Sequence, residues 1–179
     1  MASSFALYFL LLVLVANIFY FQTSLCDDAA DQALIMNICR QVQDSTFCLN
    51  TFRQNIPSHP YTPTVVTQVA ISQSLQHATN NRIFIETSKA NSKDKEIQNL
   101  FAICDSGYGF LITELQSATQ SLANKNFNAL ENSLFKCPKF VNDCQSAFGG
   151  KTTPELLDRS RKQLDLVLMA NSAEGLIQK

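Results

Sequence analysis

The sequence predicts an all-α protein, an up-down four-helix bundle preceded by a helical hairpin. Three observations lead to this prediction. Apolar side chains recur at three- and four-residue steps along four long stretches after residue 63, which is the spacing of an amphipathic helix. The 179 residues include only five glycines and five prolines, so the chain has few places to turn. No stretch shows the strict alternation of polar and apolar residues that is typical of a strand.

The first 26 residues differ in composition from the rest of the chain. Residues 5–21 carry no charge and one strongly polar side chain, Asn17, and an acidic pair, Asp27 and Asp28, follows soon after. The apolar run is slightly shorter than the ~20 residues that span a bilayer. We therefore predict a secretory signal peptide over residues 1–26, cleaved near Cys26, in preference to a membrane anchor.

Residues 27–62 are expected to form a helical hairpin and a linker. Asp31 is placed to cap a short helix that ends at Cys39, and a second short helix is expected from Ser45 to about Phe52. Three prolines then fall within residues 57–63, and a helix cannot continue through them. The bundle is assigned to residues 63–179, and residues 27–179 are expected to form one domain.

The first two bundle helices have clear apolar stripes. The first is expected from Thr64, a good N-cap, to about Ser88, with a stripe that Arg82 interrupts. Its apolar members are Ile71, Leu75, Ala78 and Ile85. The second is expected to begin near Ser92 or Asp94. Its stripe comprises Ile97, Leu100, Phe101, Cys104, Tyr108, Leu111, Ile112, Leu115 and Leu122.

The third bundle helix is expected from about Asn126 to Phe148, where Gly149 and Gly150 end it. Its heptad seam consists of Leu130, Leu134, Cys137, Val141, Cys144 and Phe148. Pro138 lies within this stretch and is expected to kink or delay the helix.

The fourth bundle helix is expected to start at Thr153, with Pro154 at its first position and Glu155 in its first turn. Leu157, Leu164 and Leu168 are assigned to its inner face. Four such helices with short links can hide their apolar stripes only against one another, which favours a bundle.

Signal cleavage removes Cys26 and leaves five cysteines, so at least one thiol stays free or pairs with another chain. Cys39 and Cys48 are placed to bridge the two short helices. Cys104 lies on the apolar face of the second bundle helix and Cys144 on that of the third, so a bond between them is easy if these helices are antiparallel neighbours. Cys137 lies seven residues before Cys144 on the same face and competes for Cys104. If Cys144 takes that bond, Cys137 is a buried free thiol.

No arrangement of residues typical of catalysis, metal binding or cofactor binding is present. The two histidines are His59 in the linker and His77 inside the first bundle helix, and neither has an acid or thiol obviously placed beside it. The formal net charge is −1, with no basic stripe for nucleic acid. We expect a protein that is not an enzyme, has no catalytic or metal residues and needs no cofactor.

Several short segments together resemble the plant invertase and pectin methylesterase inhibitor family. They are the apolar segment before Cys39, the segment from Thr46 to Phe52, Cys104 followed by Tyr108, residues 126–130 and residues 144–148. The resemblance extends from residue 31 to about residue 178. It implies an N-terminal helical hairpin beside a four-helix bundle, with bonds Cys39–Cys48 and Cys104–Cys144 and Cys137 left free.

The resemblance also implies the partner and the mode of action. It implies a secreted inhibitor, in the apoplast or alternatively the vacuole, that blocks a target carbohydrate enzyme in a complex expected to be 1:1. We expect pectin methylesterase as the target, with acid invertase as the alternative. A secreted bundle without any enzyme target is the third alternative. No nucleic acid is expected as a partner, and no membrane after signal cleavage.

Invertase inhibitors of this family carry a Pro-Lys-Phe tripeptide before the third bundle helix. This chain has that tripeptide at Pro138, within the third helix and away from the family position. The family position holds Lys125, Asn126 and Phe127, which keeps the lysine and the phenylalanine and lacks the proline. These three residues are the candidate contacts with the target enzyme.

Overall fold

The computed structural model describes residues 29–57 and 61–177. Within these ranges all regular secondary structure is helical, which confirms the all-α fold. Residues 29–39 are helical, and the further helices are α2 (Ser45–Asn55), α3 (Pro63–Asn91), α4 (Lys95–Ala123), α5 (Phe127–Ala147) and α6 (Pro154–Glu174). The expected signal peptide, residues 1–26, and His59 lie outside the described residues.

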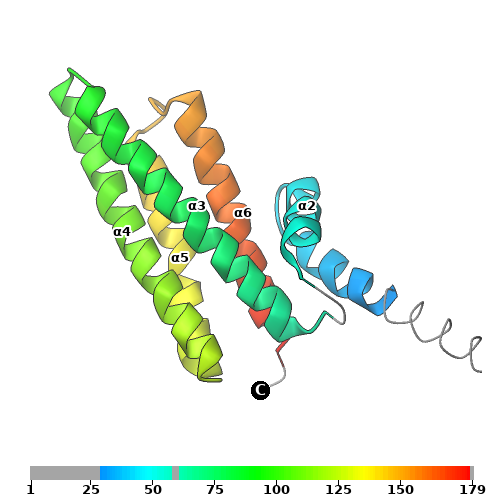
Figure 1. Cartoon of the computed structure of the whole chain (residues 1–179). Coiled ribbons are helices and arrows are strands. Elements are labelled where there is room, and N and C mark those ends of the chain that lie inside the picture. The colour runs from blue at the N-terminus through cyan, green and yellow to red at the C-terminus, as the bar shows by residue number, and fades with distance from the viewer. Residues whose placement is uncertain (1–28, 58–60, 178–179) are drawn as a thin grey trace, which may run out of the picture.

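The helices α3 to α6 form the predicted four-helix bundle (Figure 1). The α3–α4 and α5–α6 connections lie at one end, at the top of Figure 1, and the α4–α5 connection lies at the other. Each bundle helix contacts two neighbours, because α4 and α6 both pack against α3 and also against α5. The hairpin made by residues 29–39 and α2 lies beside the bundle, where α2 contacts α3 and α6.

Side-chain caps define where the bundle helices begin. Thr153 caps α6, as the sequence predicts, and Asn126 caps α5 at its predicted start. Of the two predicted starts of α4, Ser92 and Asp94, the structure has Asp94 as the N-cap. The helix α3 begins two residues earlier than predicted. Its N-cap is Thr62, whose hydroxyl accepts from the backbone N–H of Val65 at 3.3 Å. The prediction of a cap at Thr64 was wrong because proline is well suited to the first helical position, where its missing N–H costs nothing.

Asp31 also has a different role from the one predicted. It lies inside the helix of residues 29–39 rather than before it, and it is buried. Its carboxylate accepts a hydrogen bond from the backbone N–H of Tyr61 at 2.8 Å. Asp31 therefore joins the hairpin to the segment that leads into α3, a contact between residues thirty positions apart.

The buried face of α6 is shifted from the predicted one. Leu157, Leu164 and Leu168 are only half-buried. The residues that face the bundle core include two polar side chains among apolar ones: Leu156, Ser160, Gln163, Val167 and Ala170. The prediction of the inner face was wrong because these polar residues do not stand out in an apolar pattern. The predicted α5 seam, in contrast, is buried at all six positions.

The helix α5 runs through Pro138 without a break, so the predicted delay of the helix was wrong. Proline has no N–H to donate to the carbonyl four residues earlier, which is that of Leu134. The Nδ2 amide of Asn171 on α6 donates to this carbonyl at 3.3 Å. A buried carbonyl left without a donor costs about 1–3 kcal/mol, so Asn171 removes part of the cost of the proline.

The helices α4 and α5 approach each other closely. A disulfide joins Cys104 to Cys144, whose Cα atoms lie 4.4 Å apart. A Cβ atom at Gly107 would lie 3.2 Å from the carbonyl oxygen of Phe140, so the approach depends on the glycine. Cys137 is a buried free thiol that donates to the Ser133 carbonyl at 3.3 Å. Burial raises the pKa of Cys137 to about 12, which makes this thiol unreactive.

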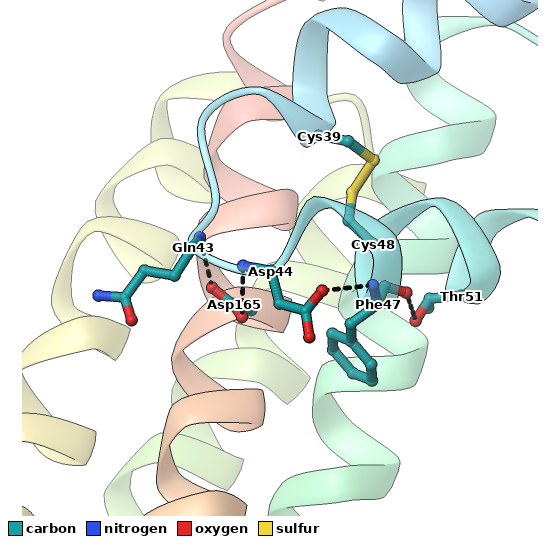
Figure 2. The surroundings of a disulfide bond; sticks show 7 residues. All are labelled: Cys39, Gln43, Asp44, Phe47, Cys48, Thr51 and Asp165. Atoms are coloured by element: carbon teal, nitrogen blue, oxygen red, sulfur yellow. Dashed lines mark hydrogen bonds between the residues drawn. A yellow bond between two sulfur atoms is a disulfide. The ribbon is translucent and has the colours of Figure 1, made fainter.

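Figure 2 shows how the hairpin is closed and attached. A disulfide joins Cys39 to Cys48, so the structure contains the two disulfides that were expected. The turn between the two short helices meets Asp165 of α6. Its carboxylate is buried and accepts from the backbone N–H groups of Gln43 at 2.9 Å and Asp44 at 3.3 Å. One carboxylate of the bundle thus anchors the hairpin turn.

Candidate functional site

The α4–α5 connection, which holds the three candidate contacts, is a tight reversal of the chain. The backbone N–H of Lys125 donates to the Leu122 carbonyl at 3.1 Å, and that of Asn126 donates to the Ser121 carbonyl at 2.9 Å. These two bonds form a Schellman motif, which satisfies carbonyls at the end of a helix. The backbone of the connection is therefore fixed by α4 itself.

Lys125 occupies the left-handed position of this motif, with a φ of 54°. Glycine usually fills that position, and another residue costs about 1 kcal/mol there. The Lys125 side chain is exposed, and the structure shows no ion pair between its ammonium group and any described residue. The site thus holds a strained backbone and an unpaired cation at the same residue.

Asn126 forms hydrogen bonds with both helices that the connection joins, α4 and α5. Its backbone N–H completes the end of α4, and its side-chain Oδ1 accepts from the Ala129 N–H at 3.2 Å to cap α5. Phe127 is the first residue of α5, half-buried and packed against the core. With α4 ending and α5 starting within three residues, Lys125 and Phe127 are held in a fixed relation to each other.

A groove opens beside Lys125 and Phe127 at this end of the bundle. It has a volume of about 430 Å³ and is formed by the first turns of α3, the last turns of α4 and the connection. Its apolar lining includes Ile71 of α3 and Leu122 of α4. Lys125 is its one charged lining residue. The geometry offers a partly apolar surface with a single cation at its edge.

The structure places the other Pro-Lys-Phe tripeptide in the interior of α5, where its side chains are engaged. The ammonium group of Lys139 pairs with Asp143. The ring of Phe140 stacks on that of Phe110 of α4, with centroids 5.7 Å apart. The structure therefore does not bring this tripeptide together with the α4–α5 connection.

A buried polar layer between α3 and α6 was not predicted. Gln163 donates through Nε2 to the carbonyl and hydroxyl oxygens of Ser74 at 3.2 and 2.9 Å. Its Oε1 must then face His77, whose Nδ1 lies 3.0 Å away. The same Nδ1 lies 3.1 Å from Nδ2 of Asn81, so one ring nitrogen contacts both an amide oxygen and an amide NH₂. Burial lowers the pKa of His77 below its ordinary value, so the ring is neutral near pH 7.

Among the described residues, His77 has no partner typical of a catalytic site. The nearest polar partners are amides, and nucleophilic catalysis needs a thiol or hydroxyl with an oriented base. No group of three or more possible metal ligands occurs in the described ranges. Among the helices of residues 29–57 and 61–177, none is long and apolar enough to span a membrane.

Comparisons with known proteins identify both sequence and structural relatives. The sequence profile of the family described as plant invertase/pectin methylesterase inhibitor matches residues 33–173. Comparison with curated protein sequences gives no match.

Two solved structures have similar folds. One is a crystal structure of mutant form A of a pectin methylesterase inhibitor from Arabidopsis, with a TM-score of 0.73 and 14% identity; the match covers 81% of this chain and 97% of the other. The second is a crystal structure of a pectin methylesterase inhibitor from Arabidopsis thaliana, with a TM-score of 0.63 and 14% identity. That match covers 83% of this chain and 99% of the other. At this identity the likeness demonstrates the shared fold.

Proposed function

This chain belongs to the plant invertase/pectin methylesterase inhibitor family, and on that basis we propose that it is a secreted inhibitor of a plant pectin methylesterase. It binds the enzyme 1:1 and blocks access to the active site, so inhibition depends on surface complementarity and involves no chemical step. The family profile, which covers most of the chain, is the observation that carries the proposal. The two structural relatives, both named as pectin methylesterase inhibitors, agree with it.

Within this proposal the α4–α5 connection contacts the enzyme. Lys125 presents an unpaired ammonium beside an open groove, and Phe127 places an aromatic ring at the groove edge. The Schellman motif and the Asn126 cap hold this surface in one conformation before binding. A preformed surface loses little conformational freedom in the complex, which favours affinity.

Acid invertase, a β-fructofuranosidase, is the alternative target. The observation that favours it is the lysine and phenylalanine at the position of the invertase-inhibitor tripeptide, Lys125 and Phe127. Glycosidases carry a pair of carboxylates at the scissile bond, and an unpaired ammonium would complement such a pair. The apoplast is the proposed location for either target, with the vacuole as the alternative for an invertase inhibitor.

A titration of the secreted protein against a plant pectin methylesterase and an acid invertase, each at pH 5 and pH 7, tests the proposal. Saturation at one inhibitor per enzyme with the pectin methylesterase alone is the expected result. Inhibition of the invertase alone would replace the first target by the second. Inhibition of neither would contradict both and leave a secreted helical bundle without an enzyme target.

Single variants test the contact surface. Lys125→Gly removes the ammonium and suits the left-handed backbone, so lost inhibition cannot come from a damaged turn. Phe127→Ala removes the ring. Each is expected to weaken inhibition by at least about tenfold, as for a residue at the centre of an interface. Lys93→Ala, in the connection at the other end of the bundle, and Phe135→Ala, on the outer face of α5, are matched controls. Equal inhibition by all four variants would reject the α4–α5 connection as the contact.

A further inference from the structure

A second hollow lies between the hairpin and the bundle and shares no lining residue with the groove at the α4–α5 connection. It has a volume of about 220 Å³ and is formed by α2, α3 and α6. The residues of α2 that line it fall at spacings of three and four, and so do those of α3, so each helix contributes one face. One face of α2 and one face of α3 therefore lie opposite each other across the hollow.

These two faces carry amide side chains where packed helices usually carry apolar ones. The amide residues that line the hollow are Gln54, Asn55, Gln73, Gln76 and Asn80. The other lining residues add a hydroxyl, an imidazole and two apolar groups, and the lining includes no aspartate, glutamate, lysine or arginine. The hollow is thus lined by five amide side chains beside apolar surface, and by no charged side chain.

Most of the hydrogen-bonding capacity of these amides is not used within the protein and is open to solvent or a ligand. Gln54, Gln73, Gln76 and Asn80 make no side-chain hydrogen bond with any residue of the described chain. Asn55 donates through Nδ2 to the Thr51 carbonyl at 2.8 Å and keeps its Oδ1 free. A primary amide offers two donors and an acceptor at adjacent atoms. A ligand with neighbouring hydroxyl groups, each both a donor and an acceptor, complements such a lining.

The hollow also has an apolar wall. Phe47 of α2 and Leu166 of α6 line it, and Figure 2 shows the Phe47 ring projecting from α2 on the side away from the Cys39–Cys48 bond. An aromatic face packs well against the C–H groups of a sugar ring, while the amides bind its hydroxyls. The disulfide and the Asp165 contacts hold α2 in place, so the wall exists before a ligand arrives.

We propose that this hollow is a binding site for one ring of a neutral oligosaccharide. The amides supply hydroxyl recognition, and Phe47 supplies the stacking surface. A uronic acid is disfavoured because no lysine or arginine lines the hollow to pair with its carboxylate. The site does not depend on the proposed enzyme target, and it would let the protein hold a glycan while the α4–α5 connection remains free.

Titration of the secreted protein alone, followed by NMR chemical shifts, tests the proposal. Cellotetraose represents a wall glucan, a high-mannose glycan represents the sugar of a glycoprotein, and tetragalacturonate is the anionic comparison. Saturable shifts at α2 and at residues 73–80 with at least one neutral ligand are expected, and tetragalacturonate should bind at least about tenfold more weakly. The neutral ligand that binds identifies the source.

The double variant Gln73→Ala with Asn80→Ala should weaken neutral-ligand binding by about tenfold or more, as expected for the loss of two hydrogen bonds. Both residues are at the surface of a long helix, so the fold should be unaffected. Gln116→Ala with Gln120→Ala, two exposed amides of α4, is the matched control and should bind normally.

Three outcomes would overturn the sugar site. One is the absence of saturable shifts with either neutral ligand up to about 10 mM, where even a weak complex would be visible. The second is equal binding by the double variant. The third is inhibition of the enzyme that falls in the double variant without any sugar binding by the parent protein, which would make the hollow part of the enzyme interface. Because no enzyme is present in the titration, its result is separate from that of the inhibition assays.

Discussion

The bundle and the hairpin differ in the contacts that hold them. The α4–α5 seam consists of side chains that water does not reach, such as Leu111, Leu134 and Val141, and a disulfide crosses it. The buried apolar residues of the hairpin, including Phe52, join the same core, and its turn adds polar contacts centred on Asp165. Apolar contacts spread over a seam are lost gradually, whereas the contact between α6 and the hairpin turn depends on one carboxylate and can be removed by one substitution. The hairpin turn should therefore be loosened by a single substitution that leaves the α4–α5 seam intact.

The largest effect that distinguishes the two regions is expected from removal of their disulfides. The Cys104–Cys144 bond closes a sequence separation of 40 residues and the Cys39–Cys48 bond one of 9. Loop-closure entropy then predicts losses of about 4 and about 2.5 kcal/mol in the free energy of unfolding. Urea unfolding of Cys104→Ala with Cys144→Ala, and of Cys39→Ala with Cys48→Ala, measures both.

Each variant removes both partners, so that the free thiol of Cys137 cannot form a new bond with a leftover cysteine. Cys137→Ala is the control and keeps both disulfides. A larger loss from the hairpin pair than from the bundle pair would contradict the view that the bundle disulfide constrains more of the unfolded chain.

The next effect is expected from Asp165→Asn, which weakens the contact between α6 and the hairpin turn and leaves the other contacts of both regions intact. The amide can accept one of the two backbone hydrogen bonds, while its own NH₂ opposes the other N–H. Hydrogen bonds to a charged group are worth about 1.5–3 kcal/mol, so we expect a loss of about 2 kcal/mol. Hydrogen exchange should increase in residues 41–48 and stay unchanged in α4 and α5.

Asp158→Asn is the matched control on the same helix. Among the described residues, the carboxylate of Asp158 pairs with Lys162, one turn away at the surface, and such a pair contributes no more than about 0.5 kcal/mol. Equal exchange in the two variants would show that the Asp165 contacts do not hold the hairpin.

The smallest effect is expected from His77 of the bundle, whose protonation makes the free energy of unfolding depend on pH. Burial lowers its pKa below the ordinary 6.5. As the pH falls below 6.5, His77 becomes protonated in the unfolded chain, while the buried ring of the folded protein stays neutral. The free energy of unfolding therefore decreases with falling pH until the folded ring is also protonated. The decrease is at most about 1.4 kcal/mol per pH unit. His77→Gln should have a smaller decrease between pH 7 and pH 5 in urea unfolding; parallel curves for the two proteins would contradict this assignment.

The sequence predicted the helices well because their signals are local. The caps Asp94, Asn126 and Thr153 and the α5 seam all depend on residues within a few positions of one another. The start of α3 was wrong by two residues because Thr62 and Thr64 flank the same proline and both can cap. The candidate contacts Lys125, Asn126 and Phe127 came from family resemblance, and their role stays a proposal.

By itself, the sequence determined that this chain forms long amphipathic helices and where most of them begin, because helix periodicity and capping are short-range properties. Only the tertiary structure decided which polar groups pair across the molecule. Asp165 accepts hydrogen bonds from a turn more than a hundred residues earlier. Asn171 donates to the Leu134 carbonyl, which has no N–H donor at Pro138. Gln163 donates to Ser74 and so brings this polar residue into the interface between α3 and α6. A buried polar group must find a partner wherever the fold supplies one, and that partner leaves no pattern in the nearby sequence.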